Sequence, residues 1–324
     1  MNRSLQFWRM MGGALLGLLA AATGRSDWVR DTSSIAWTAH GSTVWKFSFD
    51  PKAGKPFFHP VGPVGGPMSL TNFKPKDHPW HYGLWFSWKY INHVNYWEED
   101  PHTGEAQGKT RWTTPLIEEH PDGGAVIRLD VRYVDPAGKV VMTEHRDITV
   151  SAPDAQGGYA IDWNGHFTAG EADLLLDRTP MPSEPGGKVN GGYAGLSMRM
   201  DSLPVMMSVV TTHGAVTTFT DDRARPFSPA VGCNFTQDGQ PIGGLAILSA
   251  PQNIRSEAPW YLINAGSSKD FPDGFRFACA AVLAPRPQPV PAGGHLNLSY
   301  RVLVTAGAWT PDTLQAACSA WPHG

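Results

Sequence analysis

The chain has 324 residues, of which 41% are hydrophobic and 17% charged, and its formal net charge at pH 7 is −3. A charged fraction below the roughly 25% of typical soluble domains excludes a disordered, charge-dominated chain. The slight negative charge also argues against a nucleic-acid partner, because binding to a phosphate backbone needs a basic surface. The many glycines and prolines, 35 and 28, indicate frequent turns.

The N-terminal segment, residues 1–24, is predicted to be a signal peptide. Arg3 and Arg9 precede an apolar run from Met10 to Ala22 that ends in three alanines. This run is shorter than the roughly 20 residues that a membrane-spanning helix needs. We therefore expect a bacterial protein that is periplasmic or secreted, with no stable membrane insertion after cleavage. An uncleaved N-terminal anchor is the alternative.

Alternation of apolar and polar residues predicts strands along most of the remaining chain. In chain order, the alternating runs are 43–49, 125–133, 159–163 and 296–304. Alternation of this kind fits a sheet with one buried and one solvated face. Turn-forming residues separate the runs at 121–124, 135–138, 237–240 and 291–294.

Residues 140–150 also have a strand-like pattern, but they are charged, and we expect a solvated sheet edge there. Near the C-terminus, Thr310 as N-cap, Pro311 at the first helical position and Asp312 in the first turn predict a short helix. The sequence thus predicts an all-β fold, a large antiparallel β-sandwich formed by residues 25–324 as a single domain, with a short C-terminal helix.

Cys233, Cys279 and Cys318 are the three cysteines of the chain. An oxidising compartment would permit one disulfide and one free thiol, and the sequence does not select the pair. The spacings are too wide for a zinc cluster, so all three are interpreted as structural. No metal or other cofactor is predicted.

Polar and aromatic functional groups are densest between residues 71 and 100. His78 and His81 lie three residues apart, and Pro79 between them indicates a loop, because proline interrupts a helix. Imidazole is the side chain best suited to proton transfer near neutral pH. We predict that His78 and His81 transfer protons and that Asp77 orients one ring. A metal site on the two histidines is the weaker alternative, because the motif offers no third ligand.

Other residues of this region are predicted to bind substrate. Trp80 and Trp88 would form a wall on which a sugar ring stacks, whereas Trp85 is interpreted as a core residue. Asn72 and Glu98 are further candidate contacts. A solvated turn is the alternative interpretation of Glu98.

Two later segments supply further candidates. The glycine-rich segment 186–199 contains Tyr193 and Arg199, which would bind hydroxyls or a carboxylate. A glycine-rich turn with a structural arginine is the alternative. Arg255, in the segment 249–261, is predicted to lie on the other wall of the cleft.

These segments together resemble an exported bacterial family labelled "methane oxygenase PmoA", which is now mostly treated as a family of unknown function. The residues that carry the resemblance are Lys76–His81, Gly83–Trp88, Asn95–Glu99, Tyr193–Ser197 with Arg199, and Tyr300–Val302. The turn and strand at 293–302 are also similar to the last strand of galactose-mutarotase-like supersandwiches. The resemblance implies a β-supersandwich, often encoded near genes for carbohydrate use.

The residues and the resemblance together predict an exported carbohydrate-active enzyme, a lyase, hydrolase or epimerase, that uses histidine-based proton transfer on a sugar or uronic acid. Its partner would be a small-molecule or oligosaccharide substrate. A non-catalytic carbohydrate-binding module is one alternative. A metal-dependent oxidase, as the family label suggests, is the other.

Overall fold

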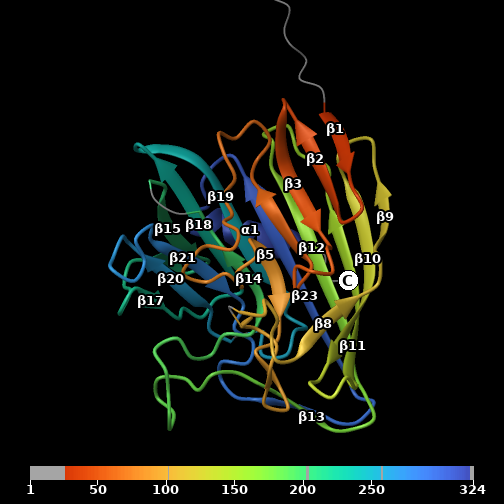
Figure 1. The fold of residues 1–324 in the computed structure, drawn as a ribbon. Coiled ribbons are helices and arrows are strands. Elements are labelled where there is room, and N and C mark those ends of the chain that lie inside the picture. Colours follow the sequence, from red (N-terminus) through yellow and green to blue (C-terminus); the bar gives the residue numbers. More distant parts are fainter. Residues whose placement is uncertain (1–25, 101, 202–203, 257, 322–324) are drawn as a thin grey trace, which may run out of the picture.

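The structure, a computed structural model, describes residues 26–100, 102–201, 204–256 and 258–321. The predicted signal peptide lies outside the described residues. Within these ranges the chain forms three antiparallel sheets and one short helix (Figure 1). The predicted all-β sandwich with a C-terminal helix is therefore confirmed. None of the described helical residues forms a span long and apolar enough to cross a membrane.

Two large sheets form the layers of the sandwich. The nine-stranded sheet contains, in spatial order, β1 (Ser26–Arg30), β2 (Ser34–Ala39), β3 (Ser42–Ser48), β4 (Phe57–Val61), β5 (Leu84–Ser87), β14 (Gly195–Arg199), β21 (Phe275–Cys279), β20 (Tyr261–Ala265) and β17 (Arg223–Ala224). The ten-stranded sheet contains β16 (Gly214–Val216), β15 (Met206–Thr211), β18 (Ala230–Gln237), β19 (Gln240–Ser249), β23 (His295–Thr305), β12 (Tyr159–Ala169), β11 (Val140–Val150), β10 (Ala125–Val134) and β8 (Lys109–Trp112), and β9 (Leu116–Glu119) also pairs with β10.

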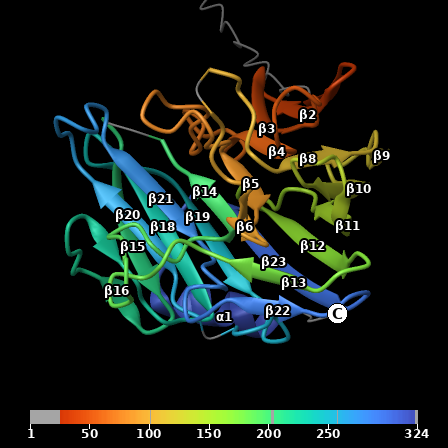
Figure 2. The same cartoon turned by 60° about the horizontal axis from the view of Figure 1, so that its bottom comes forward.

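A small sheet closes one end of the sandwich (Figure 2). Its four strands are β22 (Gln288–Val290), β13 (Leu174–Asp177), β6 (Tyr90–Ile91) and β7 (Val94–Asn95).

The main core lies between the two large sheets, where alternate residues of both sheets meet. On β23 the inward residues are Leu296, Leu298, Tyr300, Val302 and Val304. The predicted alternation at 125–133, 159–163 and 296–304 corresponds to strands whose inward residues are buried. Burial of these side chains supplies most of the driving force for folding.

β11 is an interior strand, so the predicted sheet edge at 140–150 is wrong. It pairs with β10 on one side and with β12 on the other. Two of its charged residues point into the core, where Arg146 Nε donates to Glu144 Oε1 over 2.6 Å. The hydroxyl of Tyr133 also donates to Glu144, over 2.6 Å. The charges of this strand therefore mark a solvated face and a buried ion pair rather than a free edge.

The middle strands of the nine-stranded sheet are buried on both faces. Residues such as Leu84, Leu196 and Ala278 point into the main core, whereas Trp85 and Phe277 point to the opposite, outer face. Loops cover this outer face and contribute Tyr82, Trp97 and Tyr193 to a second apolar cluster, which we call the outer cluster. The outer cluster carries the candidate site.

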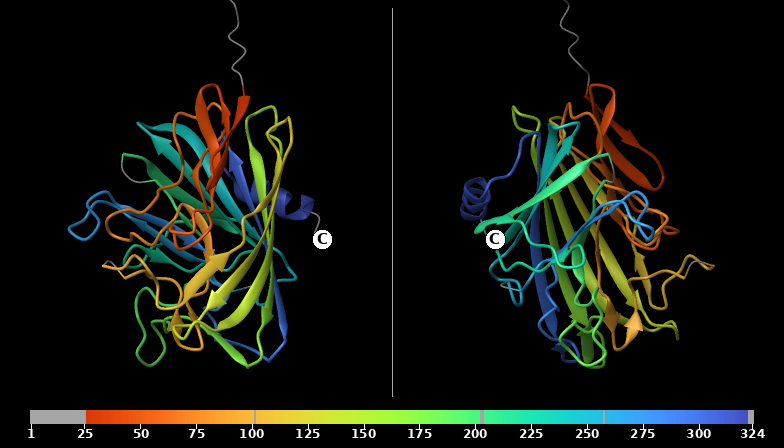
Figure 3. Two further views of the ribbon diagram at one scale, coloured as in Figure 1. Left: turned by 45° about the vertical axis from the view of Figure 1, so that its right-hand side comes forward. Right: turned by 90° about the vertical axis from the view of Figure 1, so that its left-hand side faces the viewer.

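The helix α1 (Pro311–Ala320) packs against the ten-stranded sheet, on the face turned away from the main core. Thr310 caps it and Pro311 occupies its first turn, as predicted. Leu314 is fully buried against Ala230 and Leu248 on the outer face of the ten-stranded sheet. Figure 3 shows the helix and the loops of residues 50–100 on opposite sides of the sandwich.

All three cysteines are free thiols. Cys233 lies in the main core, Cys279 in the outer cluster and Cys318 on α1. The disulfide that an oxidising compartment would permit is not formed.

Candidate active site

A cavity of about 370 Å³ lies on the outer face of the nine-stranded sheet. Tyr261 and Ile263 of β20 and Phe275 and Phe277 of β21 form its floor. Ile263 pairs with Phe277 across the two strands, which places the four side chains on one face of the sheet. The volume falls in the range of small-molecule sites.

Loops and one short strand form the walls. The lining residues beyond the floor are His78, Trp80 and His81 before β5, Trp97 and Glu98 after β7, Val189, Asn190 and Tyr193 before β14, Arg223 on β17, and Phe271. Aromatic surfaces and a few polar groups therefore meet in one space, which is the usual composition of a ligand site.

Tight turns fix the histidine loop. The backbone N–H of His78 donates to Pro75 O, and that of His81 donates to His78 O, each over 3.0 Å. The N–H of Lys74 donates to His81 O over 2.8 Å and closes the loop. Both imidazoles are thereby brought together, with ring centroids 4.7 Å apart.

Asp77 orients His78. Its Oδ2 lies 2.8 Å from His78 Nδ1, and because an ionised carboxylate only accepts, Nδ1 carries the proton. The terminal nitrogens of Arg199 donate to both Asp77 oxygens, over 2.8 and 3.0 Å. Burial raises the pKa of Asp77. The hydrogen bonds from His78 and Arg199 and the charge of the arginine together lower it by more than burial raises it, so the pKa lies below its usual value. Nε2 of His78 is left as the basic nitrogen.

Arg199 is 1% exposed and stacks on Phe275, with its guanidinium carbon 3.9 Å from the ring centroid. Because it is absent from the cavity lining and both terminal nitrogens bind Asp77, it cannot contact substrate directly. The predicted substrate-binding role of Arg199 is wrong, and the residue positions Asp77 instead.

His81 is a buried, neutral imidazole. Its ring stacks on Phe277 at a centroid distance of 5.1 Å, and its Nδ1 is buried without a hydrogen-bond partner. Burial lowers the pKa of His81 well below its usual value, and the positive charges nearby, including that of Arg199, lower it further. At neutral pH this ring is therefore uncharged.

Glu98 is the second polar centre of the cavity. It accepts from the Tyr193 hydroxyl over 2.5 Å and from Asn95 Nδ2 over 2.8 Å, and it pairs with Lys89. Burial raises the pKa of Glu98. The charge of Lys89 and these hydrogen bonds together lower it by more than burial raises it, so the carboxyl is ionised at neutral pH. Burial and the Glu98 charge raise the pKa of Tyr193, which stays protonated.

Five of the residues predicted from sequence line the cavity: His78, Trp80, His81, Glu98 and Tyr193. Their chemical roles stay predictions. Asp77 lies behind His78, and Asn72 lies outside the lining, where its backbone N–H donates to Arg199 O over 3.0 Å.

The other two predicted contacts are wrong. Trp88 has no exposed surface and packs in the main core against Phe86 and Phe167, so it cannot stack on a ligand. Arg255 also lies outside the lining, because its guanidinium donates to the backbone oxygens of 282, 286 and 287 and holds that turn in place.

Several lining residues had no signal in the sequence. Phe275 and Phe277 flank Arg276, but all three are buried, so the run has no solvated face to mark it. Arg223 belongs to a two-residue strand, which is too short for a periodic pattern. The alternation of Arg223 and Arg225 around Ala224 was the one available hint.

Residues 178–194, which we call the roof segment, hold Tyr193 over the cavity. Arg225 Nη2 donates to the backbone oxygens of Val189 and Gly191, over 3.1 and 2.7 Å. A Cβ on Gly191 would lie 1.9 Å from Pro180 O, so only glycine fits this close approach.

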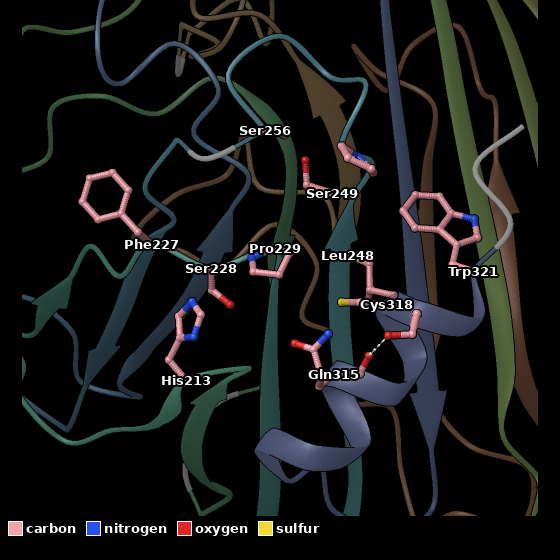
Figure 4. Close-up of a pocket in the computed structure, with 12 residues that line it drawn as sticks. His213, Phe227, Ser228, Pro229, Leu248, Ser249, Ser256, Gln315, Cys318 and Trp321 are labelled. Carbon is pink, nitrogen blue, oxygen red and sulfur yellow. Dashed lines mark hydrogen bonds between the residues drawn. The ribbon is translucent and has the colours of Figure 1, made fainter.

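A second cavity, of about 420 Å³, lies between α1 and the ends of β18 and β19 (Figure 4). Phe227 and Trp321 stand at its sides, and Ser319 Oγ donates to Gln315 O over 3.0 Å. None of the described residues that line it is Asp, Glu, Lys or Arg. His213 is the one imidazole among its described lining residues, whereas His78, His81 and Glu98 together line the first cavity. In the described residues no three or more His, Cys, Asp or Glu side chains form a group that could hold a metal ion.

Fold and site together define an antiparallel β-sandwich with an aromatic cavity that contains two histidines and an ionised carboxylate. The chain belongs to a family of unknown function, DUF6807, whose model matches residues 34–319. A search of curated proteins finds no matching sequence.

Solved structures with an overlapping architecture include sugar enzymes of low identity. A GH36 α-galactosidase from Geobacillus stearothermophilus in complex with 1-deoxygalactonojirimycin has a TM-score of 0.47 at 9% identity over 88% of this chain, which spans 41% of that chain. A candidate mutarotase from Salmonella typhimurium has a TM-score of 0.45 at 11% identity, with 87% of this chain and 94% of that chain covered. A candidate aldose 1-epimerase from Klebsiella pneumoniae has a TM-score of 0.42 at 7% identity, with 88% and 82% covered.

Proposed function

We propose that this chain is an exported carbohydrate-active enzyme that moves a proton on a sugar bound in the first cavity, as a lyase or an epimerase does. The observation that carries the proposal is the Asp77–His78 pair at the wall of this cavity, 2.8 Å between Oδ2 and Nδ1. A carboxylate that fixes the imidazole tautomer leaves Nε2 as a general base.

The carboxylate count of the cavity favours this chemistry over glycoside hydrolysis. Hydrolases of the usual kind need two carboxyl groups that face the scissile bond. Among the described lining residues Glu98 is the one carboxylate, and Asp77 is turned to Arg199 and His78. Imidazole-based proton transfer uses the groups that are present.

The remaining lining residues suit a sugar. Trp80 and Phe271 supply apolar surface for C–H faces, and Asn190 supplies an amide for hydroxyl groups. His81, neutral at pH 7, can donate to or accept from a hydroxyl. Tyr193, whose hydroxyl donates to Glu98, holds that carboxylate at the wall.

The test is a panel of oligosaccharides assayed for unsaturated products, new reducing ends and epimers, with wild type beside His78→Gln. We expect the variant to lose about 100-fold or more in kcat/KM, the scale of a general base. His145→Gln is the matched control, because His145 Nδ1 also lies 2.8 Å from an aspartate, Asp130, but on the solvated face of β11. Full activity of a folded His78→Gln protein would refute the proposal. Sugar binding without turnover would refute it in favour of a binding module.

A further inference from the structure

We propose that Arg223 binds a carboxylate of the substrate, so that the cavity selects uronic acids over the corresponding neutral sugars. This inference rests on the proposed function and names its substrate class. It transfers to Arg223 the carboxylate recognition that the sequence had suggested for Arg199.

The charges around the cavity leave Arg223 as the cation that is available to a ligand. Asp77 is paired with Arg199, and Glu98 is paired with Lys89. Arg223 lines the cavity and, within the part of the chain that the structure describes, has no carboxylate within ion-pair distance. A guanidinium is the side chain that best matches the two oxygens of a carboxylate.

Two hydrogen bonds orient this guanidinium. Nε donates to the Tyr261 hydroxyl at the cavity floor over 3.3 Å, and Nη1 donates to the backbone oxygen of Asp221. Nη2 makes no hydrogen bond to a described residue. Asp221 and Asp222 lie on the preceding turn, but both are exposed and neither lines the cavity. Solvent screens such exposed charges more than those inside a cavity.

Arg225, two residues after Arg223, binds the protein itself rather than lining the cavity. Its guanidinium carbon lies 4.3 Å from the centroid of the Tyr261 ring, and its Nη2 binds the roof segment. Arg225 does not line the cavity. Of the two arginines, Arg223 is therefore the one placed to meet a ligand.

The strand register puts Arg223 and the proton-transfer group at opposite ends of the floor. Arg199 pairs with Phe277, Phe277 with Ile263, and Ile263 with Arg223. Three strand spacings separate the Cα atoms of the two arginines by about 14 Å. A sugar ring over Phe277 and Ile263, with its carboxylate toward Arg223, would extend toward His78.

Binding of the substrate carboxylate by Arg223 would also assist removal of the neighbouring proton. The hydrogen on the carbon next to a carboxylate is the most acidic C–H of a uronate, and a bound arginine stabilises the charge that builds up when it leaves. In β-elimination, His78 Nε2 takes the C5 proton, the C4–C5 double bond forms and the C4–O bond breaks, and the departing oxygen takes a proton. In epimerisation, a proton returns to C5 from the other face. A neutral sugar with a hydroxymethyl group at C5 has no such acidic hydrogen, whereas the methyl ester of a uronate keeps the hydrogen and loses only the negative charge.

The experiment measures binding and turnover of matched ligands: oligogalacturonate beside its methyl ester, and oligoglucuronate beside cello-oligosaccharide. We expect wild type to bind at least one acidic ligand about 10-fold or more tightly than its neutral partner. Arg223→Gln should remove this preference by weakening binding of the acidic ligand about 10-fold or more, while Arg223→Lys should restore part of it. Arg132→Gln, on the exposed face of β10, is the control for net charge.

The outcomes separate this inference from the proposed function. If wild type turns over neutral sugars with full dependence on His78 and shows no acid preference, the uronate inference is wrong and the proposed function stands. If an acid preference exists but survives in both Arg223 variants, the assignment of Arg223 is wrong. If uronates bind through Arg223 without any turnover, carboxylate recognition stands and the proposed function fails. Thermal unfolding of each variant verifies that it is folded.

Discussion

Asp77 and Arg199 show how a residue's role depends on its partner. The two are 122 positions apart in the chain, and their side chains form a two-point ion pair in a half-buried place. Arg199 thereby fixes a carboxylate that in turn fixes His78. Arg199, which the sequence suggested as a substrate contact, thus positions Asp77 and His78 instead.

A double-mutant cycle tests this pair. Arg199→Gln should lower the free energy of unfolding at pH 7 by about 3 kcal/mol, because it leaves a carboxylate partly buried without its counterion. Adding Asp77→Asn should recover about 1 kcal/mol or more of that loss, since the unpaired charge is then gone. Urea unfolding of the four proteins measures the coupling. If the changes in unfolding free energy of the two single variants add up to that of the double variant, the ion pair makes no coupling contribution to stability.

His59 predicts a pH dependence of stability. Burial lowers the pKa of His59 from 6.5 to about 4, and the charge of Lys46 lowers it further. The unfolded chain therefore binds a proton near pH 6.5 that the folded chain binds only near pH 4. Stability should fall as the pH drops through this window, by about 2 kcal/mol from this residue at pH 5.

The check is urea unfolding at pH 7.5 and pH 5. His59→Asn should lose less stability between the two than wild type does, because Asn can keep the hydrogen bond that His59 Nδ1 shares with Thr71 Oγ1, 3.0 Å away, but does not titrate. His145→Asn, at an exposed position, should behave as wild type. Equal losses for His59→Asn and wild type would contradict the assignment.

Among the elements, the roof segment depends on a few contacts. Arg225 ties its backbone at Val189 and Gly191 to the sheet, and Arg178 binds Glu184 over 2.5 Å. Segments with few buried apolar contacts open locally at low free energy. The position of Tyr193 over the cavity therefore depends on these polar ties.

Replacement of Arg225 by Ala should loosen the roof segment. We expect amide exchange in residues 187–193 to accelerate about 10-fold or more, because two hydrogen bonds to the backbone are lost, while exchange in β10 and β12 is unchanged. Hydrogen–deuterium exchange with mass spectrometry measures both regions. Arg286→Ala, an exposed arginine outside the roof, should leave the roof as in wild type. Unchanged protection in Arg225→Ala would show that other contacts hold the segment.

The elements also show what could be predicted from sequence and why. β10, β12 and β23 each have one buried face, so their alternation was visible. β20 and β21 are buried on both faces, by the core and by the outer cluster, and their runs show no period. The histidine loop stood out by its composition, whereas Trp88 shares that composition and belongs to the core. Contacts such as Asp77 to Arg199 depend on strand order, which local patterns do not reveal.

At the scale of the whole molecule, the candidate site and α1 lie on opposite outer faces of the sandwich (Figure 3). Leu314→Ala should therefore lower the free energy of unfolding by about 2–4 kcal/mol, because a fully buried leucine leaves a cavity. Ligand affinity in the first cavity should be unchanged at a temperature where the variant is folded. Calorimetric titration and urea unfolding measure the two effects, and a parallel loss of affinity would show that the faces are coupled.

The double-sided burial of β20 and β21 has a consequence for how relatives of this chain can diverge. A single inserted or deleted residue in either strand would swap core and cavity side chains at every following position. Changes in length are then confined to the connecting loops, where Trp80, Glu98 and Asn190 reside. We therefore expect the floor to keep its shape among relatives, and substrate preference within the family to evolve at the rim.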